Sequence, residues 1–143
     1  MLNFEDSKDC IPSRALKSHF AIYGRQEEVN CIISSHPLNI SVLCAVQAGI
    51  DTVYMPLPYS NLSRVFPLEY DSCLCPDFVA SHFYKPLVGS ISSLLIANDG
   101  AIVIGKSIQD AYDRLQILES SCSIAIDACS LGCQEELFLI HRP

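Results

Sequence analysis

The stretch LLIANDGAIVIGKS, residues 94–107, contains the pattern that decides the fold. Two short apolar runs, residues 92–97 and 101–105, flank Asn98, Asp99 and Gly100. Short apolar runs of this kind indicate strands, and an aspartate–glycine pair between them is a preferred hairpin turn. We therefore expect two adjacent antiparallel strands joined at this turn.

A long amphipathic helix is predicted directly after the second strand. Ser107, followed three positions later by Asp110, indicates a helix start with an acidic first turn. Apolar residues then recur at alternating spacings of three and four, which places them on one face, and Gly132 ends the pattern. The members of this face are Ile108, Ala111, Leu115, Leu118, Cys122, Ala125 and Cys129.

Upstream of the hairpin, shorter helices are predicted to alternate with strands. Residues 56–86 hold five of the eight prolines, so most of that region is expected to be extended loop. Alternating elements and a late hairpin predict a single α/β sandwich domain over residues 1–143 with a mixed sheet. The expected elements are a loose arm at 1–10, helices at 13–25, 38–48 (stopped by Gly49) and 77–84, and strands at 29–33 and 52–55.

The composition excludes several classes of protein. The chain has 143 residues, of which 50% are hydrophobic, which suffices for one packed core. A net charge of −7 without a basic cluster disfavours nucleic acid and anionic membrane surfaces as partners. We expect no membrane insertion, because no run approaches ~20 apolar residues. The acidic start from Met1 to Asp6 has no apolar segment of a secretory signal, so a cytoplasmic protein is expected.

The eight cysteines are interpreted as reduced thiols rather than as a disulfide or zinc framework. The spacing Cys-x-x-Cys does not occur. Cys31 and Cys44 lie in apolar runs, and Cys122 and Cys129 lie on the apolar face of the long predicted helix. Free cysteine behaves as a small buried hydrophobe, and reduced thiols are typical of the cytosol.

Two positions could carry metal chemistry. His36 follows a predicted buried strand, where ligand residues often lie, and its imidazole could bind a metal. Alternatively, it caps the next helix or bonds to a loop. Asp99 could be a carboxylate ligand or a base, but the simpler explanation is a turn residue.

Two further features lie near the start of the chain. Ser13 and Arg14 stand at a predicted helix start, where a hydroxyl, a guanidinium and backbone N–H groups can hold an anion. The alternative is an ordinary helix cap with an exposed arginine. For His19, on the same helix, we expect a structural role. The sequence contains no glycine-rich phosphate loop, nucleophile elbow or His-Glu-x-x-His motif.

The order of three segments, residues 12–23, 29–37 and 94–107, resembles the class II aldolase/adducin family. The resemblance extends over roughly residues 11–132. It implies a three-layer α/β/α fold with a mixed, mostly antiparallel sheet. In the family, three histidines hold a zinc-type cation that stabilises an enediolate as a Lewis acid, and a glutamate transfers protons in the aldolases.

On this resemblance, most of the chemical groups of the family are replaced. Ser34 occupies the position of the first metal histidine, His36 that of the second, and Asp99 that of the third. Ala15 occupies the position of the glutamate. The family's phosphate-binding segments would precede residue 1, so the resemblance implies a domain shortened at its N-terminus.

Three hypotheses follow from the resemblance. The first is a non-catalytic structural or interaction module that forms a tetramer-like ring or associates with a paralogue. The second is a lyase (aldolase) or epimerase acting on a small sugar phosphate, with Ser13 and Arg14 as substrate-binding residues. Its divalent metal would be zinc, or Mg²⁺ or Mn²⁺, held by His36, Asp99 and a third group such as His82 or Asp77. The third is a fragment that exposes apolar sheet surface and aggregates.

Overall fold

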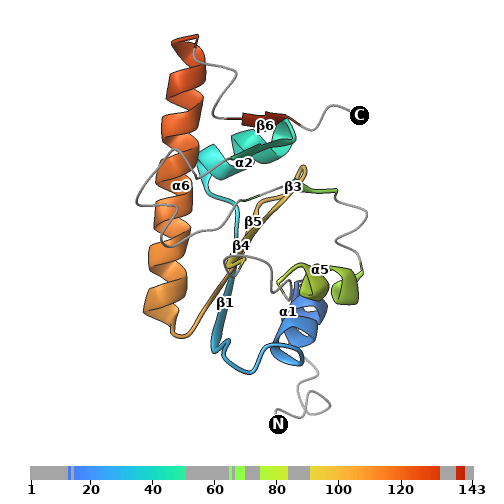
Figure 1. Cartoon of the computed structure of the whole chain (residues 1–143). Helices are drawn as coiled ribbons and strands as arrows, with labels where there is room; N and C mark the ends of the chain where they lie inside the picture. Colours follow the sequence, from blue (N-terminus) through green and yellow to red (C-terminus); the bar gives the residue numbers. More distant parts are fainter. Residues whose placement is uncertain are drawn as a thin grey trace.

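The computed structural model of the chain describes residues 13, 15–50, 65, 67–69, 75–83, 91–132 and 138–140 (Figure 1). Helices and strands alternate through most of this part, as predicted. The helices are α1 (Leu16–Tyr23), α2 (Leu38–Ala45), α5 (Pro76–His82) and α6 (Ile108–Ser130). The strands are β1 (Cys31–Ser35), β2 (Ala48–Ile50), β3 (Pro67–Leu68), β4 (Ser93–Ile96), β5 (Ala101–Gly105) and β6 (Phe138–Ile140).

The central sheet is mixed and mostly antiparallel. Its strand order is β1-β5-β4-β3, with β5 antiparallel to β1 and to β4, and β3 parallel to β4. The strands β2 and β6 form a separate antiparallel pair. The predicted hairpin is β4–β5, in which Leu95 lies opposite Ala101.

Helices cover both faces of the central sheet, which gives the three layers that the resemblance implies (Figure 1). Successive strand residues point to opposite faces, so the hairpin contributes to two cores. Leu95 and Val103 belong to the core beneath α2 and α6. Leu94 and Ile102 belong to the core beneath α1 and α5. These findings confirm the expected α/β fold class.

The long helix α6 follows the predicted periodicity closely. Ser107 is its N-cap, and Ser107 Oγ accepts a hydrogen bond from the Asp110 N–H at 3.1 Å. Beyond the helix, Gly132 has a φ of +88°. The prediction that Ile108 lies on the buried face is wrong: Ile108 is the first residue of α6 and is exposed. The predicted residues that are buried are Ala111, Leu115, Leu118, Cys122 and Ala125.

The second helix ends earlier than predicted. α2 ends at Ala45, and Gln47 then turns the chain with a φ of +55°. Gly49 was expected to stop the helix, but this prediction is wrong: Gly49 lies in β2, opposite Leu139. No sequence signal marked β6, because a three-residue strand is stabilised by its pairing with a distant segment.

The other boundaries differ by a few residues. α1 begins at Leu16 rather than at Ser13, and β1 is shifted two residues toward the C-terminus. The predicted arm at 1–10 and the predicted strand at 52–55 lie outside the described residues. No helix in the described part of the chain is long and apolar enough to cross a membrane. The described cysteines, Cys31, Cys44, Cys75, Cys122 and Cys129, are free thiols, and Cys44 and Cys122 are buried.

Candidate functional site

His36 and Asp99 lie in direct contact although they are far apart in the sequence. His36 follows β1, and Asp99 lies in the β4–β5 turn, so the pairing of β1 with β5 brings them together. The Nε2 atom of His36 lies 2.8 Å from Oδ1 of Asp99. Since an ionised carboxylate only accepts, the imidazole Nε2–H donates this bond. The side chains are 62% and 39% exposed, so the pair lies at the surface.

The turn that carries Asp99 is held by Cys44 of α2. The Asn98 N–H donates to the Cys44 carbonyl oxygen at 3.0 Å, and the Cys44 thiol donates to the Gly100 carbonyl oxygen at 3.3 Å. Burial, and to a smaller extent the charge of Asp99, raise the pKa of Cys44 to about 11, so the thiol keeps the proton that it donates. Both neighbours of Asp99 are therefore bound to one buried residue.

Gly100 provides the space in which His36 lies. A Cβ atom at Gly100 would lie 2.3 Å from the Ser35 carbonyl oxygen and 2.9 Å from Cδ2 of His36. The positive φ of the turn, 58°, belongs to Asn98. The glycine is therefore required for the close approach of β1 and the imidazole, and not for the turn conformation that the sequence suggested.

The start of α2, next to His36, is fixed by a carboxylate from α6. Glu119 Oε1 accepts hydrogen bonds from the backbone and side-chain N–H groups of Asn39, both at 2.9 Å. Glu119 Oε2 accepts one from the Ile40 N–H at 3.0 Å. Sequence reasoning assigned no role to Cys44 or Glu119 at this site, because their partners are 54 to 80 residues away.

Ser34, at the position of the lost metal histidine, is engaged with α1. Its Oγ atom and Nε2 of His19 share a hydrogen bond of 2.7 Å. Burial lowers the pKa of His19 from its ordinary value of 6.5. His19 therefore links α1 to β1, in agreement with a structural role.

The described residues do not bring a third metal ligand to His36 and Asp99. Among them, no group of three or more histidine, cysteine, aspartate or glutamate side chains could hold a metal ion. Both suggested third groups lie on α5 and have other partners: Asp77 binds Arg25 at 2.7 Å, and His82 Nδ1 donates to the Phe78 carbonyl oxygen at 2.8 Å. Catalytic zinc usually has about three protein ligands, so this donor set does not fit it.

The beginning of α1 carries the remaining predicted residues. Ala15, at the position of the family's glutamate, has a methyl group that cannot transfer a proton. Ser13 Oγ accepts a hydrogen bond from the Ala15 N–H at 3.3 Å. The predicted cap at Ser13 is nevertheless wrong, because the N-cap of α1 is Ala15, which makes no side-chain cap bond. Arg14 lies outside the described residues, so an anion site at Ser13 and Arg14 stays a prediction.

The α/β/α layers and the hairpin beside His36 define a domain of the class II aldolase type. The family model for the class II aldolase and adducin N-terminal domain matches residues 3–126. The chain therefore belongs to this family.

The chain is similar to adducins and to aldolases alike. It is 24% identical to human beta-adducin over 148 residues, which cover 97% of this chain and 20% of that protein. It is 23% identical to the L-fuculose phosphate aldolase of Methanococcus maripaludis over 110 residues, 76% of this chain and 57% of the aldolase. A sugar-phosphate aldolase from Thermotoga maritima superimposes with a TM-score of 0.66 at 21% identity, over 85% of this chain and 56% of that one. The chain thus spans less than two thirds of these relatives.

Proposed function

We propose that this chain is a non-catalytic member of the class II aldolase/adducin family that serves as a cytoplasmic structural or interaction module. The observation that supports this proposal is the direct hydrogen bond between His36 and Asp99, at 2.8 Å. His36 and Asp99 are the two residues at the family's metal-ligand positions whose side chains can still bind a metal, and they bind each other. A metal between them would have to break this bond and find its remaining ligands elsewhere.

The neighbouring substitutions point in the same direction. Ser34 replaces an imidazole by a hydroxyl, a poor zinc ligand, which is bonded to His19. Ala15 removes the group that transfers protons in the aldolases. The packing around the site, by contrast, is well formed: Gly100 lies against β1, Cys44 is buried, and the carboxylate of Glu119 binds the start of α2.

Self-association is the interaction that we propose for this module. On α2 the side chains of Leu38, Val42 and Val46 are exposed by 76%, 43% and 65%. Their spacing of four places them along one face of the helix and its C-cap. The sequence of α2 contains no charged residue, so two copies can bring this face together without like-charge repulsion despite the net charge of −7. A second copy, in a tetramer-like ring, is the proposed occupant.

Sedimentation velocity over a concentration series, with and without a chelator, tests this proposal. We expect assemblies that are unaffected by the chelator and that dissociate in the variant Leu38→Glu. Ile124→Glu is the matched control, because Ile124 is an exposed isoleucine on α6. Dissociation by the chelator would contradict a metal-independent module. A monomer at all concentrations would contradict self-association and leave a paralogue as the expected partner.

The alternative function is a divalent-metal-dependent aldolase or epimerase acting on a small sugar phosphate. The observation that favours it is that an imidazole and a carboxylate adjoin at a surface where Mg²⁺ or Mn²⁺ could add water ligands. Incubation with L-fuculose phosphate and added Zn²⁺, Mg²⁺ or Mn²⁺ distinguishes the two functions. We expect no turnover. Metal-dependent turnover that Asp99→Asn abolishes would establish the alternative.

A further inference from the structure

The start of α2 has no side-chain cap from its own N-cap residue. The first N–H groups of a helix have no partner within it, and a serine, threonine or aspartate at the N-cap usually accepts from one of them. The N-cap of α2 is Pro37, whose side chain has no acceptor, and the first turn contains no acidic residue. Glu119 of α6 replaces this cap across the tertiary structure, through its bonds to Asn39 and Ile40.

His36 lies between β1 and α2, so the position of α2 contributes, with the pairing of β1, to the position of His36. His36 directly precedes Pro37, which has a φ of −64° and a ψ of 157°, so only one stiff, extended residue separates His36 from the helix. On its other side the imidazole ring lies against Gly100 and binds Asp99. A small rotation of the helix start would therefore carry the imidazole away from Asp99.

We infer that Glu119 is a positioning residue for His36: its carboxylate caps α2 from α6 and thereby holds the imidazole against Asp99 and Gly100. Hydrogen bonds to an ionised carboxylate are stronger than those between neutral groups, and a negative charge at a helix N-terminus is favourable. The inference rests on the geometry of the proposed site, and it holds whether that site is inert or binds a metal.

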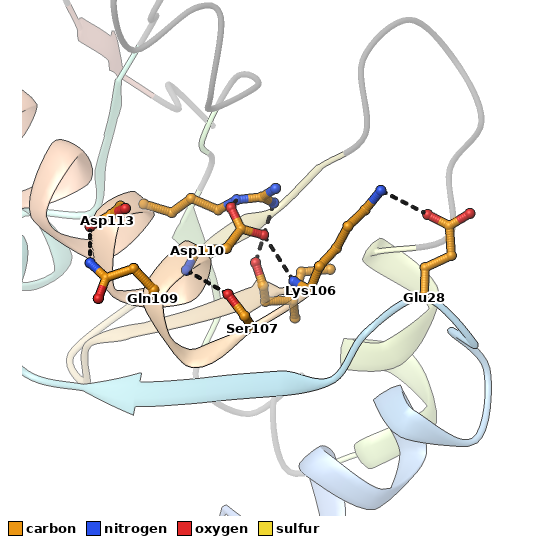
Figure 2. Close-up of polar contacts among 8 residues, drawn as sticks. Glu28, Lys106, Ser107, Gln109, Asp110 and Asp113 are labelled. Atoms are coloured by element: carbon orange, nitrogen blue, oxygen red, sulfur yellow. Dashed lines mark hydrogen bonds and ion pairs between the residues drawn. The ribbon is translucent and has the colours of Figure 1, made fainter.

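Asp110 offers a matched control on the same helix. Asp110 Oδ2 accepts a hydrogen bond from the Lys106 N–H at 2.9 Å, and Oδ1 accepts one from Arg114 Nε at 2.8 Å. Figure 2 shows Asp110 beside Lys106 at the beginning of α6, and both partners of its carboxylate are within four residues. Both carboxylates are half-buried and bind at the start of a helix, but only that of Glu119 binds the helix that follows His36.

The test is NMR spectroscopy of the full chain, since Cδ2 of His36 lies against the Cα of Gly100. The nuclear Overhauser cross-peak between His36 Hδ2 and Gly100 Hα reports this contact directly. We expect the cross-peak to disappear in Glu119→Ala and to persist in Asp110→Ala. Glu119→Gln keeps one oxygen acceptor, so it should retain a weakened cross-peak.

Amide exchange supplies a second measurement, which is decisive if Glu119→Ala does not fold. In Glu119→Gln the Ile40 amide should exchange about tenfold faster or more, because its charged acceptor is lost, while amides in the middle of α6 keep their rates. An unchanged cross-peak in Glu119→Ala, or an equal loss in Asp110→Ala, would overturn the positioning role. Bound metal would contradict the proposed function, but it would leave this comparison of variants intact.

Discussion

The helices α6 and α2 obtain acceptors for their first N–H groups in opposite ways. At α6, Ser107 accepts from the Asp110 N–H, and the Asp110 carboxylate accepts from the Lys106 N–H, so both bonds at this helix start lie within five residues. At α2, the acceptor for the first turn is Glu119, 80 residues beyond Asn39. The first cap can be predicted from the spacing of residues in the sequence, whereas the second forms only once the sheet and α6 are in place.

The candidate site depends on the second kind of contact. His36 and Asp99 are 63 positions apart, and Cys44 binds Gly100 across 56 positions. The exposed His36–Asp99 pair itself contributes only ~0–1 kcal/mol, as exposed pairs usually do. The site is therefore held by the buried groups around it, most of which come from distant parts of the sequence.

The largest effect is expected for Gly100→Ala. The new Cβ would collide with the Ser35 carbonyl oxygen, which is backbone and cannot move independently of β1. We expect a loss of ~3 kcal/mol or more in the free energy of unfolding, measured by urea denaturation. Gly24→Ala is the control, because its Cβ would lie 3.3 Å from the nearest atom, and it should cost less than ~1 kcal/mol. Equal losses in the two variants would show that the collision at Gly100 is relieved.

A local cap should partly replace the distant one. In a Glu119→Ala background, Pro37→Ser places a hydroxyl at the N-cap of α2, as Ser107 does at α6. We expect recovery of ~1 kcal/mol of the stability lost in Glu119→Ala, measured by the same denaturation. In the wild-type background the substitution should give no such gain, since Glu119 already occupies the donors. A gain of the same size in both backgrounds would contradict the capping role of Glu119.

The local cap should appear in the pH dependence of stability. Burial raises the pKa of Asp110, but hydrogen bonds from the Lys106 N–H and Arg114, with the charges of both side chains, outweigh it and lower the pKa below 3.8. The contribution of a carboxyl with a lowered pKa is present above its unfolded value and is lost as the pH falls through the folded value. As the pH falls below about 5, the wild type should therefore lose more stability than Asp110→Asn. Parallel curves would contradict the lowered pKa.

The smallest effect is expected for the ion pair between α1 and α5. Arg25 and Asp77 bind at 2.7 Å, but their side chains are 43% and 74% exposed. Such pairs are screened by solvent and lose side-chain entropy, so Arg25→Ala should change the unfolding free energy by less than ~1 kcal/mol. Calorimetry in low and high salt checks this expectation, and a large, salt-sensitive loss would contradict it.

The parts of the fold that were predictable have local causes. The hairpin follows from two apolar runs around Asn98 and Gly100, and α6 follows from its three-four spacing after Ser107. The sequence did not predict the left-handed backbone conformation of Gln47 or the strand β6. Both depend on the pairing of β2 with β6, which are about 90 residues apart. Residue spacing alone suggested His36 and Asp99 as two separate candidate residues and not as one site.

The resemblance to the aldolase/adducin family placed these two residues in one site, which the structure brings together. It did not indicate what supports them. Cys44 was interpreted as a core thiol, which is correct, but its bonds to both neighbours of Asp99 depend on how α2 packs beneath the hairpin. The hydrogen bonds of Glu119 and Cys44 connect separate elements, so the periodicity within one element does not predict them.

The central claim is that the fold is retained without the metal chemistry, and the metal content of the purified, dialysed protein tests it most directly. Mass spectrometry should be applied to the wild type and to the variants His36→Ala and Asp99→Asn. We predict that the wild type contains no more divalent metal than either variant and that it still unfolds cooperatively. Near-stoichiometric metal in the wild type, lost in both variants, would contradict the account and establish His36 and Asp99 as ligands.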